Sequence, residues 1–179
     1  MSGAERVFRY LDGDQERRDL VADIRRVRRA VIQMAENMPD ERRYEPRYQG
    51  LTLAALLAHL HVSDRMTMIG IQLALFGLPP FHVRVLDPFN ELTARLFKHR
   101  VIESTLGDIR RNERHIADFI LSLPIEKFSK PVYDPEHDVT LTVEQTLQES
   151  FLFHWQEHFA AMQRVEGIYY EPPERFDTL

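Results

Sequence analysis

The chain has 179 residues, 44% of them hydrophobic, and we expect one globular domain over residues 1–179. Its 28 acidic and 23 basic side chains give a net charge of −5, which provides no positive field for binding nucleic acid. It has no cysteine, which excludes disulfides, thiolate zinc sites, iron–sulfur clusters and a cysteine nucleophile. The segment before the first helix and the tail after about residue 168 are expected to be loose.

The N-terminal residues lack a charged stretch followed by an apolar one, so no signal peptide is predicted. The longest apolar run, residues 68–78, is too short to cross a bilayer. We therefore expect a cytoplasmic protein that binds neither a membrane nor a nucleic acid.

Apolar residues recur every three or four positions in four long segments, which predicts four helices. The first is expected over residues 14–38 and ends at Pro39. The second is expected over residues 52–76, with Thr52 as its N-cap and Gly77 as its end.

The third helix is expected over residues 90–123, where Gly107 marks a place for a bend or a break. The fourth is expected over residues 142–166 and opens with a capping box made by Thr142 and Gln145. Four helices of this length predict an all-α, up-down four-helix bundle.

Two longer connections separate these helices. Residues 78–89 are rich in proline and apolar side chains, and residues 124–141 carry Pro131 and Pro135 after Pro124. The second connection is compatible with a short strand over residues 130–133, but no Asn-Gly or Gly-Gly pair predicts a hairpin.

The fourth helix carries two histidines in the segment FLFHWQEHFAAM. His154 and His158 are four residues apart, so their rings project from one face. On α-helical periodicity that face continues an apolar stripe made by Leu147, Phe151, Ala161 and Val165. Both imidazoles are therefore expected to point into the core, where neutral imidazole is a common ligand for zinc, nickel or iron. The alternative is two core histidines bonded to the backbone or to each other.

A metal site needs a third ligand, and the second helix offers His59 and His61. Residues two positions apart are separated by about 200° around a helix, so only one of these two histidines can face the metal. Periodicity does not choose between them, because residues 51–60 are apolar nearly all round.

The segment LTLAALLAHLHVSD resembles the start of the second helix in the DinB/YfiT-like superfamily of four-helix metal-binding proteins. HWQEHFAAMQ resembles the HxxxH motif of that family's last helix, and PVYDPEHDVTLTVEQTL resembles the approach to it. The resemblance covers about residues 15–166 and implies that His59, His154 and His158 bind a divalent metal. The family's usual glutamate at the start of the second helix is absent, as is the arginine–glycine–glutamine after the last histidine.

Three histidines leave a coordination position open, which is typical of catalytic sites. The resemblance implies a hydrolase or a thiol transferase, with zinc, nickel or iron activating water or an external low-molecular-weight thiol. Such a thiol would resemble bacillithiol, mycothiol or glutathione. A non-catalytic metal- or ligand-binding bundle, acting in a stress response or an interaction, is the second hypothesis. A helical dimerisation domain with core histidines is the third, and a homodimer is expected.

Two further residues are candidates for contact with a small-molecule substrate. His82 lies in the proline-rich connection, and Trp155 follows His154, although a core or dimer contact is the alternative for Trp155. Asp64 and Glu157 are near the histidines in sequence and are predicted to be surface or interface charges. The remaining histidines are predicted to be surface residues: His99, His115 and His137. No histidine follows a glutamate by three positions, which excludes a ferritin-like di-iron site.

Overall fold

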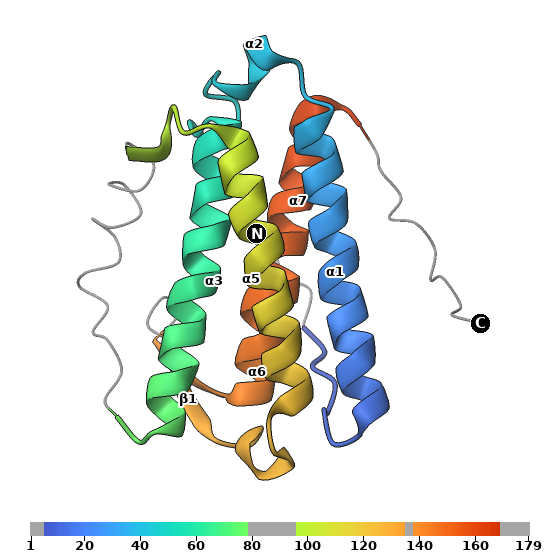
Figure 1. Cartoon of the computed structure of the whole chain (residues 1–179), viewed down its shortest axis with the longest axis vertical. Coiled ribbons are helices and arrows are strands. Elements are labelled where there is room, and N and C mark those ends of the chain that lie inside the picture. Colours follow the sequence, from blue (N-terminus) through green and yellow to red (C-terminus); the bar gives the residue numbers. More distant parts are fainter. Residues whose placement is uncertain (1–5, 79–95, 135–137, 169–179) are drawn as a thin grey trace.

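The computed structural model describes residues 6–78, 96–134 and 138–168, and long helices make up most of them. These helices are α1 (Asp14–Glu36), α3 (Leu53–Leu75), α5 (Ile102–Ser122) and a continuous helical segment formed by α6 (Val143–Gln148), η3 (Glu149–Phe153) and α7 (His154–Glu166). They pack side by side around one apolar core (Figure 1). The predicted all-α four-helix bundle is confirmed.

The helix directions differ from simple up-down alternation. The colour gradient in Figure 1 shows that α3 and α5 both run downward, whereas α1 and α7 run upward. The side chain of Thr52, at the start of α3, donates to the carbonyl of Lys98, which lies just before α5, with an O···O distance of 3.2 Å. The two helices therefore begin at the same end of the bundle and run parallel.

Two of the predicted helix starts are confirmed in their cap geometry. The Thr52 hydroxyl accepts from the backbone N–H of Ala55 at 3.1 Å and caps α3. Thr142 and Gln145 form the predicted capping box at the start of α6. Each cap satisfies backbone N–H groups that have no partner within the helix, and it thereby fixes the residue at which the helix begins.

Other helix boundaries differ from the prediction. α1 ends at Glu36, and a short helix that the sequence pattern did not predict, α2 (Asp40–Arg43), follows it. α5 begins at Ile102, and residues 98–101 are not helical, so the predicted third helix is too long at its start. Residues 79–95 lie outside the described part of the chain. α5 is continuous through Gly107, so the helix is not broken there.

A β-hairpin precedes α6. After a short 3-10 turn, η2 (Ile125–Lys127), β1 (Pro131–Asp134) pairs antiparallel with β2 (Val139–Thr142), with Val132 opposite Leu141. The predicted strand at 130–133 is thus confirmed within one residue. The sequence contains no tight-turn dipeptide at this place, which is why the second strand escaped prediction.

The segment before α1 is held against the bundle from residue 6 onward, which corrects the prediction of a loose segment there. Arg9 exchanges two hydrogen bonds of 2.9 Å with the side chain of Gln148, one through its N–H and one through its carbonyl. Leu11 is fully buried, and its carbonyl accepts from Arg17 at 3.0 Å. Residues 1–5 and the predicted loose tail after residue 168 lie outside the described residues.

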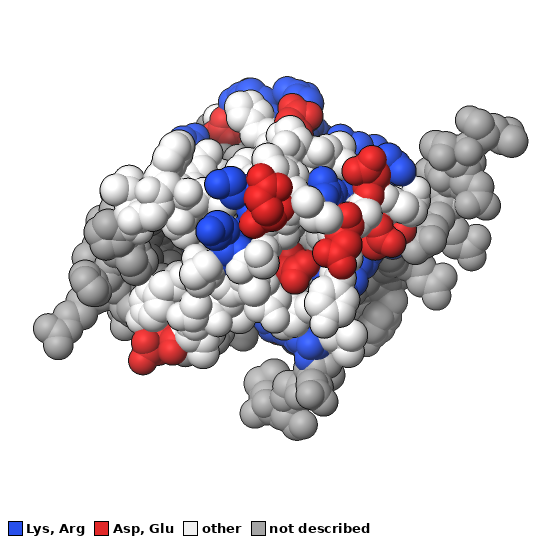
Figure 2. Space-filling view, turned by 90° about the horizontal axis from the view of Figure 1, so that it is seen from below, with Lys and Arg blue, Asp and Glu red and all other residues white. Residues whose placement is uncertain are grey.

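Acidic and basic side chains are interspersed on the lower end of the bundle (Figure 2). No helix within the described residues combines the length and apolarity that a bilayer span requires.

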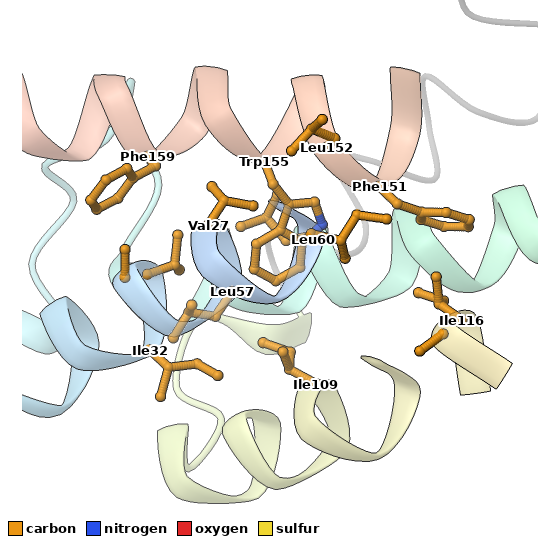
Figure 3. Packing of buried hydrophobic residues seen from close by; sticks show 14 of the residues in the cluster. Val27, Ile32, Leu57, Leu60, Ile109, Ile116, Phe151, Leu152, Trp155 and Phe159 are labelled. Carbon is orange, nitrogen blue, oxygen red and sulfur yellow. The ribbon is translucent and has the colours of Figure 1, made fainter. Parts of the chain in front are cut away.

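The core between the helices contains Trp155, which Figure 3 shows beside Val27, Leu57 and Leu60.

Candidate metal centre

Three histidines from two helices come together on one side of the bundle. His59 comes from α3, and His154 and His158 come from α7. The ring centroids of His154 and His158 are 4.7 Å apart, and that of His59 lies 5.4 Å and 5.3 Å from them. One ligand nitrogen from each ring lies within 4.8 Å of the other two, and the Nε2 atoms of His154 and His158 are 3.0 Å apart. These are the three residues that the family resemblance implied.

The π-helical turn η3 sets which face of α7 meets the core. A π turn contains one residue more than an α turn, so every later side chain is rotated by about 100° from its α-helical position. The predicted stripe is therefore correct at Leu147 and Phe151 and wrong beyond them. Trp155 is 0% exposed, whereas Val165, a member of the predicted stripe, is 39% exposed.

The same rotation places the histidines at the margin of the core. His59, His154 and His158 are each half-buried, while Phe159 and Met162 take the buried positions of α7. The prediction that both α7 imidazoles point into the core is corrected accordingly. A position at the margin keeps one side of the cluster open to solvent, which a ligand-exchanging centre requires.

Burial keeps the α7 imidazoles neutral. Desolvation, followed by the proximity of His158 and then His59, lowers the pKa of His154 to about 3. Desolvation and His59 lower the pKa of His158 to about 4, against a smaller opposing effect of Glu157. Neutral imidazoles present lone pairs near pH 7, and these are the form that binds a metal.

The spacing of the nitrogens fits a tetrahedral cation. Zinc–nitrogen bonds of about 2.0–2.1 Å at a tetrahedral angle separate two ligand nitrogens by roughly 3.3 Å. The separation of 3.0 Å between the Nε2 atoms of His154 and His158 is close to that value. With every ligand nitrogen within 4.8 Å of the others, small side-chain movements suffice to bring His59 to the same cation.

His61, the other histidine of α3 that was considered, does not join the cluster. It is buried on a different face of α3, and desolvation lowers its pKa. His99 lies near Tyr44, with ring centroids 6.4 Å apart, and His115 is exposed as predicted. His82, proposed to contact substrate, and His137 lie outside the described residues.

A second polar cluster lies in the core behind the histidines, and it corrects the prediction for Asp64. Asp64 is 0% exposed rather than a surface charge. It accepts two hydrogen bonds from Arg28, at 2.7 Å and 3.0 Å, and one from Trp155 Nε1 at 2.9 Å. Asn112 donates a fourth at 3.3 Å. We call Arg28, Asp64, Asn112 and Trp155 the Asp64 cluster.

The Asp64 cluster also decides the role of Trp155. With no exposed surface and its N–H directed at Asp64, Trp155 is a core residue and cannot touch a substrate. Sequence reasoning missed Arg28 and Asn112. Arg28 offered a signal, since it stands four residues after Ile24 and three before Val31 on the apolar stripe of α1. An arginine at such a position needs a buried carboxylate.

Glu157 is exposed, as predicted, and pairs with Arg6 from the N-terminal segment. Arg6 also pairs with Glu149, and its guanidinium carbon lies 5.7 Å from the ring centroid of Phe153. Arg6 contributes to the lowered pKa of His154, so the N-terminal segment reaches the neighbourhood of the histidines.

Comparison with known proteins gives matches in structure. No protein-family model matches the chain, and no curated protein matches its sequence. YfiT from Bacillus subtilis, described as a probable metal-dependent hydrolase with an unusual four-helix bundle topology, superposes with a TM-score of 0.71 at 17% identity, over 94% of this chain and 95% of YfiT. A protein from Streptococcus pneumoniae superposes with a TM-score of 0.69 at 16% identity, over 92% of this chain and 94% of that one. The resemblance predicted from the histidine segments is confirmed at the level of the fold.

Proposed function

We propose that the protein is a metal-dependent enzyme that holds one divalent cation with His59, His154 and His158. The observation that carries the proposal is the convergence of three ligand nitrogens, from two helices, within 4.8 Å of one another. The description of YfiT, which has the same fold, as a probable metal-dependent hydrolase supports it. Zinc, nickel and iron all accept imidazole ligands, so each is a candidate for the cation.

The chain's own residues prepare this site in three ways. His154 and His158 stay neutral because burial lowers their pKa values, so their lone pairs are available across the physiological range. α7 holds both rings on one rigid helical face, one turn apart. Half-burial excludes part of the surrounding water and leaves a side open for a small molecule. When bound, the cation supplies a Lewis acid that lowers the pKa of a water or a thiol.

Two reactions use such a site, hydrolysis and the transfer of a low-molecular-weight thiol. Hydrolysis is favoured by the description of YfiT. Thiol transfer is implied by the family resemblance, and the thiol would come from outside because the chain has no cysteine. In that reaction a carbon–sulfur bond forms, the bond to the leaving group breaks, and the thiol proton passes to solvent.

The test is a parallel assay of protein reconstituted with zinc, nickel or iron(II). Thiol transfer is followed as the absorbance of the thioether formed from 1-chloro-2,4-dinitrobenzene with bacillithiol, mycothiol or glutathione. Hydrolysis is followed with p-nitrophenyl esters. We expect one of the two activities to require the cation, to disappear with EDTA and to be lost in the double variant His154→Ala, His158→Ala.

Two other outcomes would contradict the proposal. A cation that binds without either activity would favour a non-catalytic metal-binding bundle, and no binding at all would favour a dimerisation domain with core histidines. The expected homodimer and cytoplasmic location stay predictions. Sedimentation of the purified protein tests the first of them.

A further inference from the structure

The Asp64 cluster brings together one residue from each of the four long helices. Arg28 comes from α1, Asp64 from α3, Asn112 from α5 and Trp155 from α7. Arg28 and Asp64 are both 0% exposed and form a bidentate pair. Burying such a pair is costly unless its remaining hydrogen-bonding sites are filled, and Trp155 and Asn112 fill those of the carboxylate.

The cluster lies directly beside the histidines in the chain. Trp155 is the residue after His154, and Asp64 is five residues after His59. The hydrogen bond of 2.9 Å from Trp155 Nε1 to Asp64 Oδ1 therefore joins the same two helices that the candidate ligands join. The guanidinium carbon of Arg28 lies 4.2 Å from the centroid of the Trp155 ring and covers one of its faces.

The rotation of α7 is not dictated by its apolar pattern alone. If the segment were α-helical throughout, the stripe through Leu147 and Phe151 would continue through the two α7 histidines. With the π turn, Trp155 and Phe159 are buried instead. The Trp155–Asp64 bond exists only in the second arrangement, and losing it would leave a buried carboxylate short of a donor.

From these contacts we propose that Asp64 and Trp155 are positioning residues of the metal centre. Their hydrogen bond fixes the rotation of α7 against α3, so that His154 and His158 face His59 at ligand distance. Arg28 and Asn112 hold Asp64 in place for this bond. The inference rests on the proposed metal site and adds to it the groups that set its geometry.

The experiment compares Trp155→Phe with a matched control, Tyr48→Phe. Each variant keeps an aromatic ring and removes one donor to a buried carboxylate: Tyr48 donates to Glu166, at the other end of α7, with an O···O distance of 2.9 Å. Zinc affinity is measured by competition with a chromophoric chelator. The visible spectrum of the cobalt(II)-loaded protein reports ligand geometry, and the melting temperature reports stability.

We expect Trp155→Phe to weaken zinc binding about tenfold, the lower end of what losing a residue that orients metal ligands costs. Its cobalt(II) spectrum should also change in intensity and band position. Tyr48→Phe should lower the melting temperature but leave the zinc affinity and the cobalt(II) spectrum as in the wild type.

If Trp155→Phe lowers only the melting temperature, the hydrogen bond is merely structural and the inference fails, while the metal site stands. If the wild type binds no zinc, the proposed function and the inference fail together. Should Trp155→Phe not fold, Asn112→Ala removes the longer donor of 3.3 Å. A smaller loss of zinc affinity is then expected, and an unchanged affinity and spectrum in Asn112→Ala would overturn the inference.

Discussion

The histidine cluster and the Asp64 cluster each include residues of α7, and His154 of the first directly precedes Trp155 of the second. The two clusters differ in charge and in burial. In the Asp64 cluster, Arg28, Asp64 and Trp155 have no exposed surface, and the Asp64 carboxylate accepts hydrogen bonds from the cluster's other side chains. The histidine cluster is held neutral at its α7 members, is half-buried and gathers nitrogens with lone pairs. One cluster uses its polar atoms to hold the four helices together, whereas the other brings three ligand nitrogens within 4.8 Å of one another.

The largest loss of stability is expected from a substitution in the Asp64 cluster. Asp64→Ala leaves the guanidinium of Arg28 buried without its counter-charge, and we expect a loss of about 3–5 kcal/mol in the free energy of unfolding. Urea denaturation measures it. Asp40→Ala, which removes the exposed carboxylate that pairs with Arg43, is the control and should cost less than about 1 kcal/mol. Equal losses in the two variants would show that the Asp64 cluster contributes no more than a surface pair.

Acid should destabilise the fold through the histidine cluster. The folded pKa values of His154 and His158 lie below the value of about 6.5 for an unfolded chain, so the unfolded state takes up protons first as the pH falls. Metal-free protein should therefore lose about 2 kcal/mol of stability for each of these histidines between pH 7 and pH 5. Urea denaturation at several pH values checks this. The double variant His154→Asn, His158→Asn should show a shallower slope, and an unchanged slope would refute the assignment.

Zinc should stabilise the protein through the histidine cluster only at a pH where zinc can compete with protons for the imidazole nitrogens. At pH 8, free zinc at a hundred times its dissociation constant should add about 2.7 kcal/mol to the free energy of unfolding. The gain should vanish with EDTA and be much smaller at pH 5, because protonated imidazole does not bind a metal. Thermal melts with and without zinc measure it, and a melting temperature indifferent to EDTA at pH 8 would count against the site.

The smallest effect is expected from Glu157, which is exposed and belongs to neither cluster. Glu157→Gln removes one of the exposed contacts of Arg6 and should change the free energy of unfolding by less than about 0.5 kcal/mol. It should leave zinc affinity unchanged. A large loss of zinc affinity in this variant would mean that the carboxylate itself belongs to the site.

Two helix starts and the histidine spacing could be predicted from the sequence. Thr52 and Thr142 predicted the starts of α3 and α6, because an N-cap depends only on residues that are close in the chain. The spacing of His154 and His158 indicated a shared face, and the choice of His59 over His61 came from the family resemblance. Each of these features is local in the chain.

The features that could not be predicted from the sequence depend on contacts between segments that are far apart in the chain. The π turn rotates α7 by one residue, and no local pattern in the chain marks it. Asp64 is buried only because Arg28, Asn112 and Trp155 reach it from three other helices. The parallel course of α3 and α5 is likewise set by how the bundle closes, which helix periodicity does not encode.

The most direct test of the metal centre is the metal content of protein purified without a histidine tag. After incubation with zinc and gel filtration, the wild type should retain about one zinc per chain, as a single three-histidine site requires. The double variant His154→Ala, His158→Ala should retain none, and His115→Ala, which changes an exposed histidine, should behave as the wild type. Absence of zinc from the wild type, or equal zinc in the double variant, would contradict the site.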